Sequence, residues 1–392
     1  MKGNDTRHIF LSCGEASGDR YGADLISALR SLDPDLRISA MGGELVAAAG
    51  AEIVTPSEPL AVMGFTEVVQ AWAEIRRARR SIDLFLKAEG VDLVIPLDFP
   101  GFNGWLAGRA RSLGIPVFWL IAPQLWAWGG WRTRGFRGKI DRLGTILPFE
   151  TGFFRERGFD VFPMGHPLMD DYGGDFPFQE SLARRERNLH DRDKLLTIGL
   201  FPGSRRQELE HLLPTLKVTA QAVGGHLGNR PLKFLASVAP GIDPQSVRDA
   251  FEGHVETTRD PVAQILPGCD LALVCSGTVS LEAALAGVPH ELVYHTGAFN
   301  YFIARKLVRV PYIGLSNLLL DRPVVREHVQ EGASPLPLAR SLLRWIARPA
   351  EREVFYGDCR ELRGKCGAPG VWRRTAAEIL RFAGSGRNGA GG

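Results

Sequence analysis

The sequence predicts an α/β fold made of two doubly wound domains in a chain of 392 residues. Short apolar runs recur along the chain and are continuous rather than alternating, as in parallel strands buried on both faces. Helical patterns separate these runs, and strands that alternate with helices indicate βαβ units. The length also favours two domains, because one domain contains roughly 100–200 residues.

The elements follow in order along the chain. We expect strands at His8–Ser12, Asp92–Leu97, Pro116–Ile121, Leu195–Phe201, Leu232–Val238 and Asp270–Cys275. We expect helices at Gly22–Leu32, Ile75–Ala88, Asn103–Leu113 and Thr278–Leu285. The βα pattern restarts at Leu195, after a stretch rich in Gly, Pro, Asp and Arg that is typical of a linker.

These patterns divide the chain into a first domain at 1–165, a linker at 166–189 and a second domain at 190–340. A helical tail is predicted at 341–383 and a disordered end at 384–392. Two Rossmann-like domains are expected to face each other across a cleft. Ligands of open sheets bind outside the carboxyl ends of the strands, so the chemistry is sought there.

Composition excludes several classes of protein. Lys and Arg number 47 against 44 Asp and Glu, a balance that does not suggest a nucleic-acid partner. The five cysteines form no CxxC pair, so a disulfide framework or zinc site is not expected and a cytoplasmic location fits best. No stretch reaches the roughly 18 apolar residues of a membrane span, so any membrane contact is expected to be peripheral.

The first strand leads into the sequence GEASGDRYG, which begins at Gly14. Its glycines are four residues apart and do not match the dinucleotide pattern GxGxxG. Gly18 allows close approach of a ligand, while Glu15, Ser17 and Asp19 offer polar contacts at the start of a helix. The alternative is a plain strand-to-helix turn that is capped by Ser17 or Asp19.

Two further strand ends in the first domain carry candidate side chains. Asp98 follows the strand that ends at Leu97, where a carboxylate is placed for general-base catalysis, or alternatively caps the next helix. The loop after the following strand carries Trp126, Trp128 and Trp131 beside glycines. Exposed tryptophans can stack on a sugar or line an apolar groove.

The second domain contains two turns suited to a diphosphate. Pro202-Gly203-Ser204-Arg205 joins a strand to a helix, whose free N–H groups and positive dipole end attract anions, and Arg205 adds a charged fork. The segment that begins at Ser276-Gly277-Thr278 repeats this arrangement, and Glu282 can accept hydrogen bonds from ribose hydroxyls. Together they could hold a diphosphate without a metal, so we expect no cofactor. The purely structural alternative is a helix that is capped by Ser204 and followed by two surface arginines.

An apolar segment at 61–72 precedes the arginines Arg76, Arg77, Arg79 and Arg80. An apolar stripe beside arginines suits an anionic membrane surface. A core-packed amphipathic helix with a solvated basic face is the alternative.

The motifs GEASGD, LAVMGFTEVV, DFPGFN, APQLWAW, LPFE, GHPL, FPGSRRQE and SGTVSLEAALAGVP occur in this order, followed by the stretch at 312–330. This set, over residues 8–340, resembles the lipid-A-disaccharide synthase family. The resemblance implies a GT-B-like fold, UDP-2,3-diacylglucosamine as donor and 2,3-diacylglucosamine 1-phosphate as acceptor. It implies inverting transfer to a β-1′,6-linked disaccharide, at the inner membrane, by a protein that can form a homodimer.

The resemblance also implies roles for individual residues. Asp98 would be the base on the acceptor 6-hydroxyl, with Glu15 and Asp19 near it. The residues implied to hold UDP or the donor sugar are Ser204, Arg205, Glu208, Ser276, Gly277, Thr278, Glu282, Asn317, Glu327 and Gln330. Those implied to contact acyl chains, acceptor or membrane are Met63, Phe65, Val68, Val69, Trp72, Trp126 and Trp128.

Two other functions share parts of this pattern. A UDP-sugar 2-epimerase of similar fold would use the same UDP turns, but it would not need the tryptophan loop or the apolar segment at 61–72. A lipid-binding descendant without turnover is suggested by His295, which stands where the family often has arginine. The retained Asp98, Arg205 and Glu282 argue against that second alternative.

Overall fold

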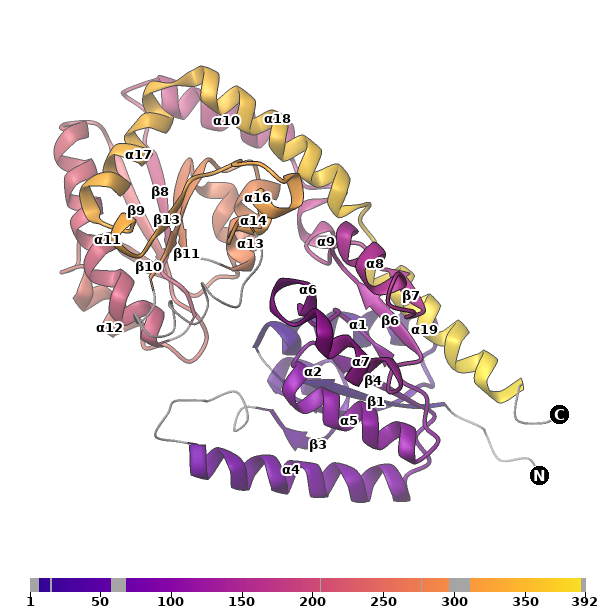
Figure 1. Cartoon of the computed structure of the whole chain (residues 1–392). Helices are drawn as coiled ribbons and strands as arrows, with labels where there is room; N and C mark the ends of the chain where they lie inside the picture. Colours follow the sequence, from indigo (N-terminus) through magenta and orange to yellow (C-terminus); the bar gives the residue numbers. More distant parts are fainter. Residues whose placement is uncertain are drawn as a thin grey trace. The chain divides into compact units, whose positions relative to one another are not determined.

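The chain folds into two α/β units (Figure 1). Unit 1 comprises residues 1–170 and 370–392, and unit 2 comprises residues 171–369. The computed structural model describes residues 7–14, 16–57, 68–204, 206–275, 277–295 and 311–388.

Unit 1 is built on parallel strands, which are β1 (His8–Cys13), β2 (Arg37–Gly42), β3 (Glu52–Pro56), β4 (Leu93–Leu97), β5 (Phe118–Trp119), β6 (Arg142–Thr145) and β7 (Val161–Pro163). Strands β3-β2-β1-β4 form one sheet in this order, and β5-β6-β7 form another. Isolated bridges from Val94 to Val117 and from Leu97 to Leu120 join the two sheets. The resulting order, 3-2-1-4-5-6-7, is that of a doubly wound Rossmann-like sheet.

Helices pack on this sheet because alternate residues of its strands point to opposite faces. The helices of unit 1 are α1 (Ala16–Leu32), α2 (Glu44–Ala48), α4 (Val68–Ala88), α5 (Pro100–Ser112), α6 (Leu125–Trp128), α7 (Thr133–Arg137), α8 (Pro148–Arg155) and α19 (Val371–Asn388), with the 3-10 turn η1 (Gly130–Arg132). Phe10 of β1 joins Ile82 of α4 and Leu106 of α5 in one buried cluster. Cys13, on the opposite face of β1, lies against Gly22 of α1.

Unit 2 repeats the arrangement with β8 (Leu196–Phe201), β9 (Leu232–Ser237), β10 (Glu256–Thr258), β11 (Leu271–Cys275), β12 (His290–Tyr294) and β13 (Glu327–Val329). All pair in parallel in the order β10-β9-β8-β11-β12-β13. Its helices are α10 (Phe178–His190), α11 (Arg206–Leu227), α12 (Pro244–Ala250), α13 (Val262–Ile265), α14 (Thr278–Leu285), α16 (Leu315–Leu320), α17 (Pro335–Ala347) and α18 (Pro349–Cys366), with 3-10 turns η2 (Leu266–Gly268) and η3 (Gln330–Gly332). The short helix α9 (Met169–Tyr172) spans the division between the units.

The prediction of a linker at 166–189 is wrong for its second half, which forms most of α10. Arg185 of this helix is fully buried and donates to the main-chain oxygens of Cys269 at 2.9 Å and Ala286 at 2.8 Å. The helical period was hidden because an arginine occupies a core position between Leu182 and Leu189. This segment is therefore an integral part of unit 2.

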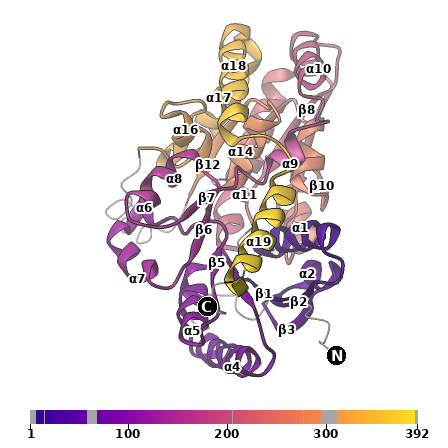
Figure 2. The same ribbon diagram turned by 90° about the vertical axis from the view of Figure 1, so that its right-hand side faces the viewer.

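The predicted tail also differs from the structure. Helices α17 and α18 belong to unit 2, whereas α19 returns to unit 1 and packs beside α1 (Figure 2). There the rings of Tyr21 and Trp372 lie 5.6 Å apart, and Arg142 pairs with Glu378 at 2.6 Å. The prediction of disorder from residue 384 is wrong for residues 384–388, which continue α19.

Candidate functional site

The carboxyl ends of β1 and β4 form the candidate site in unit 1. These strands are neighbours, with Cys13 opposite Leu97, and the chain order of the sheet reverses between them. In open sheets such a reversal leaves room for a ligand. Asp98 and the start of α1 therefore lie side by side at this switch point.

Asp98 has a strained backbone. Both Asp98 (φ 49°) and Phe99 (φ 46°) adopt the left-handed conformation, which non-glycine residues rarely take. Such strain costs of order 1–3 kcal/mol per residue and clusters at functional sites. The N-cap position of α5 is Phe99, so Asp98 is not the cap of that helix as the alternative interpretation supposed.

Asn103 holds this strained turn in place. Its Nδ2 donates to the main-chain oxygen of Asp98 at 2.7 Å and more weakly to that of Leu97 at 3.3 Å. Its Oδ1 accepts a 2.6 Å hydrogen bond from the Ser12 hydroxyl. Both Asn103 and Ser12 are fully buried, so the core of unit 1 fixes where the Asp98 side chain begins.

The glycines after β1 serve packing. A Cβ on Gly14 would lie 2.2 Å from the Phe99 ring, and one on Gly22 would lie 2.6 Å from the Cys13 sulfur. Gly18 is buried with Leu97 close by, while Ser17 is exposed in the first turn of α1. Glu15 lies outside the described residues. The spacing of four thus brings α1 close to the sheet and makes room for the Phe99 ring.

Asp19 caps a different helix from the one that contains it. Its carboxylate accepts from the backbone N–H groups of Gly43 at 2.6 Å and Leu45 at 3.0 Å, at the start of α2. The side chain is only 8% exposed. In this arrangement Asp19 fixes α2 beside the switch point.

Glu150 is a buried carboxylate that the site prediction missed. It accepts from Trp126 Nε1 at 2.9 Å and from the N–H groups of Ile146 and Leu147 at 3.1 Å each. Burial raises its pKa to about 7, although the three hydrogen bonds lower it, and the nearby charge of Asp98 adds a smaller increase. The motif LPFE contained the signal, since Glu150 stands at the third position of α8, where a glutamate closes a capping box.

The structure describes the side chains of two of the three tryptophans in the predicted loop. Trp126 is half-buried, hydrogen-bonded to Glu150 and packed edge-on against Phe149 at 4.8 Å. The side chain of Trp128 lies outside the description. Trp131, in the same loop, is 80% exposed.

The carboxyl ends of β8 and β11 form the second candidate site, in unit 2, at the corresponding reversal of strand order. After β8, Gly203 is left-handed (φ 106°), and Ser204 N–H donates to Glu208 Oε2 at 3.1 Å. A Cβ on Gly203 would lie 2.3 Å from that same oxygen. Glu208 therefore shapes the turn ahead of α11. Arg205 is outside the described residues.

The turn after β11 presents an exposed helix N-terminus. Gly277 (φ 145°) is the N-cap of α14, and both it and Thr278 are exposed; Ser276 is not described. Glu282, one turn into the helix, is 6% exposed and accepts a 3.0 Å hydrogen bond from the Tyr172 hydroxyl. Tyr172 was missed because it is 110 residues away in sequence.

Asn317 and Glu327 fold the loop around residues 313–327. Glu327 accepts from the N–H groups of Ile313 and Gly314 and from Asn317 Nδ2, at 2.9–3.1 Å. Asn317 is buried, and its Oδ1 accepts from the N–H groups of Val324 and Val325. The hydrogen bonds described for Asn317 and Glu327 are therefore internal to this loop. Gln330 begins η3 with a left-handed backbone (φ 52°).

The predicted membrane segment leads into α4. Met63 and Phe65 lie outside the described residues, and Val68 and Val69 begin α4 without described side chains. Trp72 is 62% exposed and is not in the core. Ala78, Ile82 and Leu86 of the same helix are buried in the core of unit 1, so the alternative of a core-packed amphipathic helix with a solvated basic face holds for the rest of α4. Arg76, Arg77 and Arg80 are exposed, whereas Arg79 stacks over the ring of Trp105 at 5.2 Å.

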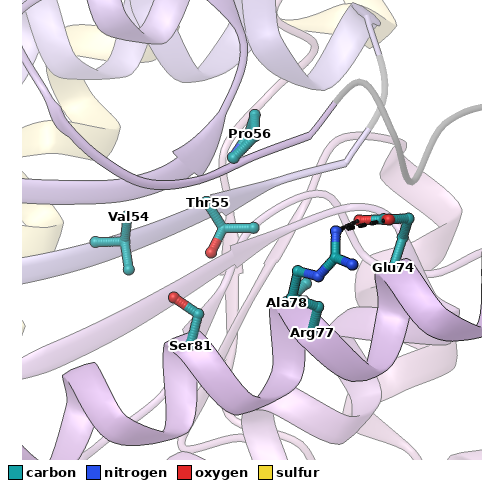
Figure 3. Close-up of a pocket in the computed structure, with 7 residues that line it drawn as sticks. All are labelled: Val54, Thr55, Pro56, Glu74, Arg77, Ala78 and Ser81. Atoms are coloured by element: carbon teal, nitrogen blue, oxygen red, sulfur yellow. Dashed lines mark hydrogen bonds and ion pairs between the residues drawn. The ribbon is translucent and has the colours of Figure 1, made fainter.

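A pocket of about 360 Å³ lies between β3 and α4 (Figure 3). Its lining includes Thr55 and Ser81, and Arg77 and Glu74 form a 2.8 Å ion pair at its side. This lining is mixed in polarity and contains none of the candidate catalytic residues. Among the described residues, no helix is long and apolar enough to cross a membrane, and no cluster of His, Cys, Asp and Glu is arranged as a metal site.

Comparison with solved structures identifies the fold. The chain matches the glycotransferase of kitacinnamycin with a TM-score of 0.63 at 15% identity, over 96% of this chain and 99% of that one. It matches the calicheamicin glycosyltransferase with a TM-score of 0.58 at 19% identity, over 98% and 99%. The UDP-GlcNAc 2-epimerase from Neisseria meningitidis also matches, with a TM-score of 0.52 at 12% identity, over 96% and 99%. These similarities show a shared GT-B fold.

Comparison of sequences identifies the family. The family model described as lipid-A-disaccharide synthetase matches residues 9–358. The chain is 36% identical to lipid-A-disaccharide synthase from Syntrophotalea carbinolica over 95% of both chains, and 34% identical to that of Syntrophus aciditrophicus over 96% of this chain and 98% of that one. The chain therefore belongs to the lipid-A-disaccharide synthase family and is a glycosyltransferase of lipid A biosynthesis.

Proposed function

We propose that the protein transfers 2,3-diacylglucosamine from UDP to the 6-hydroxyl of 2,3-diacylglucosamine 1-phosphate. The products are the β-1′,6-linked disaccharide 1-phosphate and UDP, with inversion at the anomeric carbon. The family match supports the reaction class. The epimerase alternative is supported by the fold alone, at 12% identity.

Asp98 is the proposed base, and the mechanism is argued from its position at the end of β4 and its left-handed backbone. Its carboxylate removes the proton of the acceptor 6-hydroxyl while that oxygen attacks the anomeric carbon of the donor. The bond from that carbon to the UDP oxygen breaks, and UDP leaves with the electron pair. The backbone of Asp98 is left-handed, and buried Asn103 holds its main-chain oxygen. The side chain of Asp98 therefore starts from a fixed position, which suits a general base.

Unit 2 is proposed to bind the donor. The N-termini of α11 and α14, with Ser204, Arg205, Ser276 and Thr278, would meet the diphosphate, because helix N-termini stabilise anions. Glu282 would accept hydrogen bonds from the ribose hydroxyls. Glu208, Asn317 and Glu327 support this site through the turns that they fold.

The lipid substrates require access to a membrane. We infer that the exposed face of α4 contacts the anionic surface of the inner membrane from the cytoplasm. Trp72 would enter the interface, and Arg76 and Arg80 would meet lipid phosphates. The acyl contacts of Met63, Phe65, Val68 and Val69 belong to the same proposal.

The direct test is to incubate purified protein with both diacylated substrates and to measure UDP and disaccharide. Formation of both in equal amounts, only when donor and acceptor are present together, supports the proposal. Conversion of UDP-N-acetylglucosamine to its 2-epimer without acceptor would support the epimerase instead. Lipid binding with no release of UDP would support a non-catalytic descendant.

A further inference from the structure

The segment 125–139, which contains α6, η1 and α7, carries four basic side chains and no acidic one. Trp131 is 80% exposed, while Arg134 and Arg137 are exposed on the next turn. A single exposed tryptophan is ordinary on a protein surface. A tryptophan followed by a run of basic side chains without acidic neighbours in the segment is the feature that calls for a partner.

The other side of the segment 125–139 packs into the core of unit 1. Phe136 of α7 is 8% exposed, and its ring lies 5.5 Å from that of buried Trp119. The Thr133 hydroxyl donates to the oxygen of Gly130 at 2.7 Å, which ties α7 to the turn that carries Trp131. The core thus anchors one side of the segment and leaves Trp131 facing solvent.

The segment is a neighbour of α5, which is in turn a neighbour of α4. Lys139 Nζ donates to the oxygen of Gly104 in α5 at 3.3 Å. The next residue of α5, Trp105, lies under the guanidinium of Arg79 of α4. Figures 1 and 2 both show α4, α5 and α7 in succession along one face of unit 1. Trp72 and Trp131, each accompanied by arginines, therefore belong to neighbouring parts of the same unit.

We propose that Trp131, Arg134 and Arg137 form a second contact for anionic phospholipids, in addition to α4. Tryptophan prefers the membrane–water interface, and each basic residue near an anionic surface contributes about 1 kcal/mol. Two separated contacts would fix the orientation of unit 1 on the membrane, which a single helix contact would not. This inference rests on the proposed action of the protein on membrane lipids.

The test is cosedimentation of the full chain with vesicles of phosphatidylcholine and phosphatidylglycerol in a two-to-one mixture, and with phosphatidylcholine alone. We expect Arg134→Gln with Arg137→Gln to weaken binding to the anionic vesicles roughly five- to thirtyfold. Trp131→Ser should, separately, weaken binding as well, because tryptophan prefers the membrane–water interface. The matched controls are Val354→Ser, a 67% exposed apolar residue of unit 2, and Arg187→Gln with Arg192→Gln, two exposed arginines of unit 2. The controls should bind like the unmodified protein.

The outcomes separate the inference from the proposed function. If the unmodified protein does not bind anionic vesicles, the membrane proposal fails as a whole. If Trp72→Ser weakens binding but the changes at Trp131, Arg134 and Arg137 do not, the second contact is overturned and α4 acts alone. If the arginine variant binds vesicles normally but requires more detergent-dispersed acceptor for half-maximal rate, the arginines bind the acceptor phosphate instead. Melting temperatures check that each variant is folded.

Discussion

The side-chain amide of Asn103 donates a 2.7 Å hydrogen bond to the main-chain oxygen of Asp98, a residue whose backbone is left-handed. Because Asn103 also accepts from Ser12, the bond connects the strained turn to the buried end of β1. The position of the proposed base is thus determined by core residues that need not touch substrate.

Asn103→Ala should lower turnover, because a small displacement of a catalytic group costs up to about 10²-fold. The melting temperature should fall as well, since buried polar partners are left unsatisfied at about 1–3 kcal/mol. A loss of stability alone would not identify a positioning role. We therefore expect the double variant with Asp98→Asn to be no slower than Asp98→Asn itself. Rate losses that multiply in the double variant would show that Asn103 does not act through Asp98.

Tyr172→Phe should weaken UDP binding roughly three- to tenfold, because Glu282 loses a hydrogen bond worth about 0.5–1.5 kcal/mol that orients its carboxylate. Calorimetry with UDP measures this change directly. Tyr356→Phe is the matched control, since its buried hydroxyl donates to Glu186 at 2.7 Å in the same unit. Equal UDP affinities for the two variants would remove Tyr172 from the donor site.

Glu150 makes stability depend on pH. Its pKa is raised from 4.5 to about 7 by burial, so the folded state binds its proton more tightly than the unfolded state. The resulting stabilisation is complete below pH 4.5 and is lost as pH rises through about 7. Glu150→Gln should remove this loss, so the difference in melting temperature, variant minus unmodified protein, should increase between pH 5 and 8. A constant difference would show that Glu150 stays ionised in the fold.

Activity should persist in EDTA, because the proposed donor site meets the leaving diphosphate with two helix N-termini and Arg205. UDP release is measured with and without the chelator, at equal ionic strength. Complete loss of activity that Mg²⁺ restores would contradict this prediction.

The elements that were predictable are those whose signal is local. Continuous apolar runs revealed β1, β4, β8 and β11, and the described residues that follow these strands lie at the switch points of the two sheets. Helix α10 was missed because Arg185 interrupts its apolar stripe, and the main-chain oxygens that accept its hydrogen bonds lie far away in the sequence. The same limit applied to the site: Asp19 caps a helix that begins 25 residues later, and Tyr172 meets Glu282 across 110 residues.

The role of Asp98 as the base is tested most directly by the turnover rate of Asp98→Asn, measured together with its melting temperature and UDP affinity. Asparagine keeps the shape of aspartate and tolerates the left-handed backbone, so the fold should be retained. We expect the rate to fall by roughly 10²–10⁴-fold, with nearly unchanged UDP affinity, because the proposed UDP turns belong to unit 2. A near-normal rate would contradict it and would direct attention to Glu15.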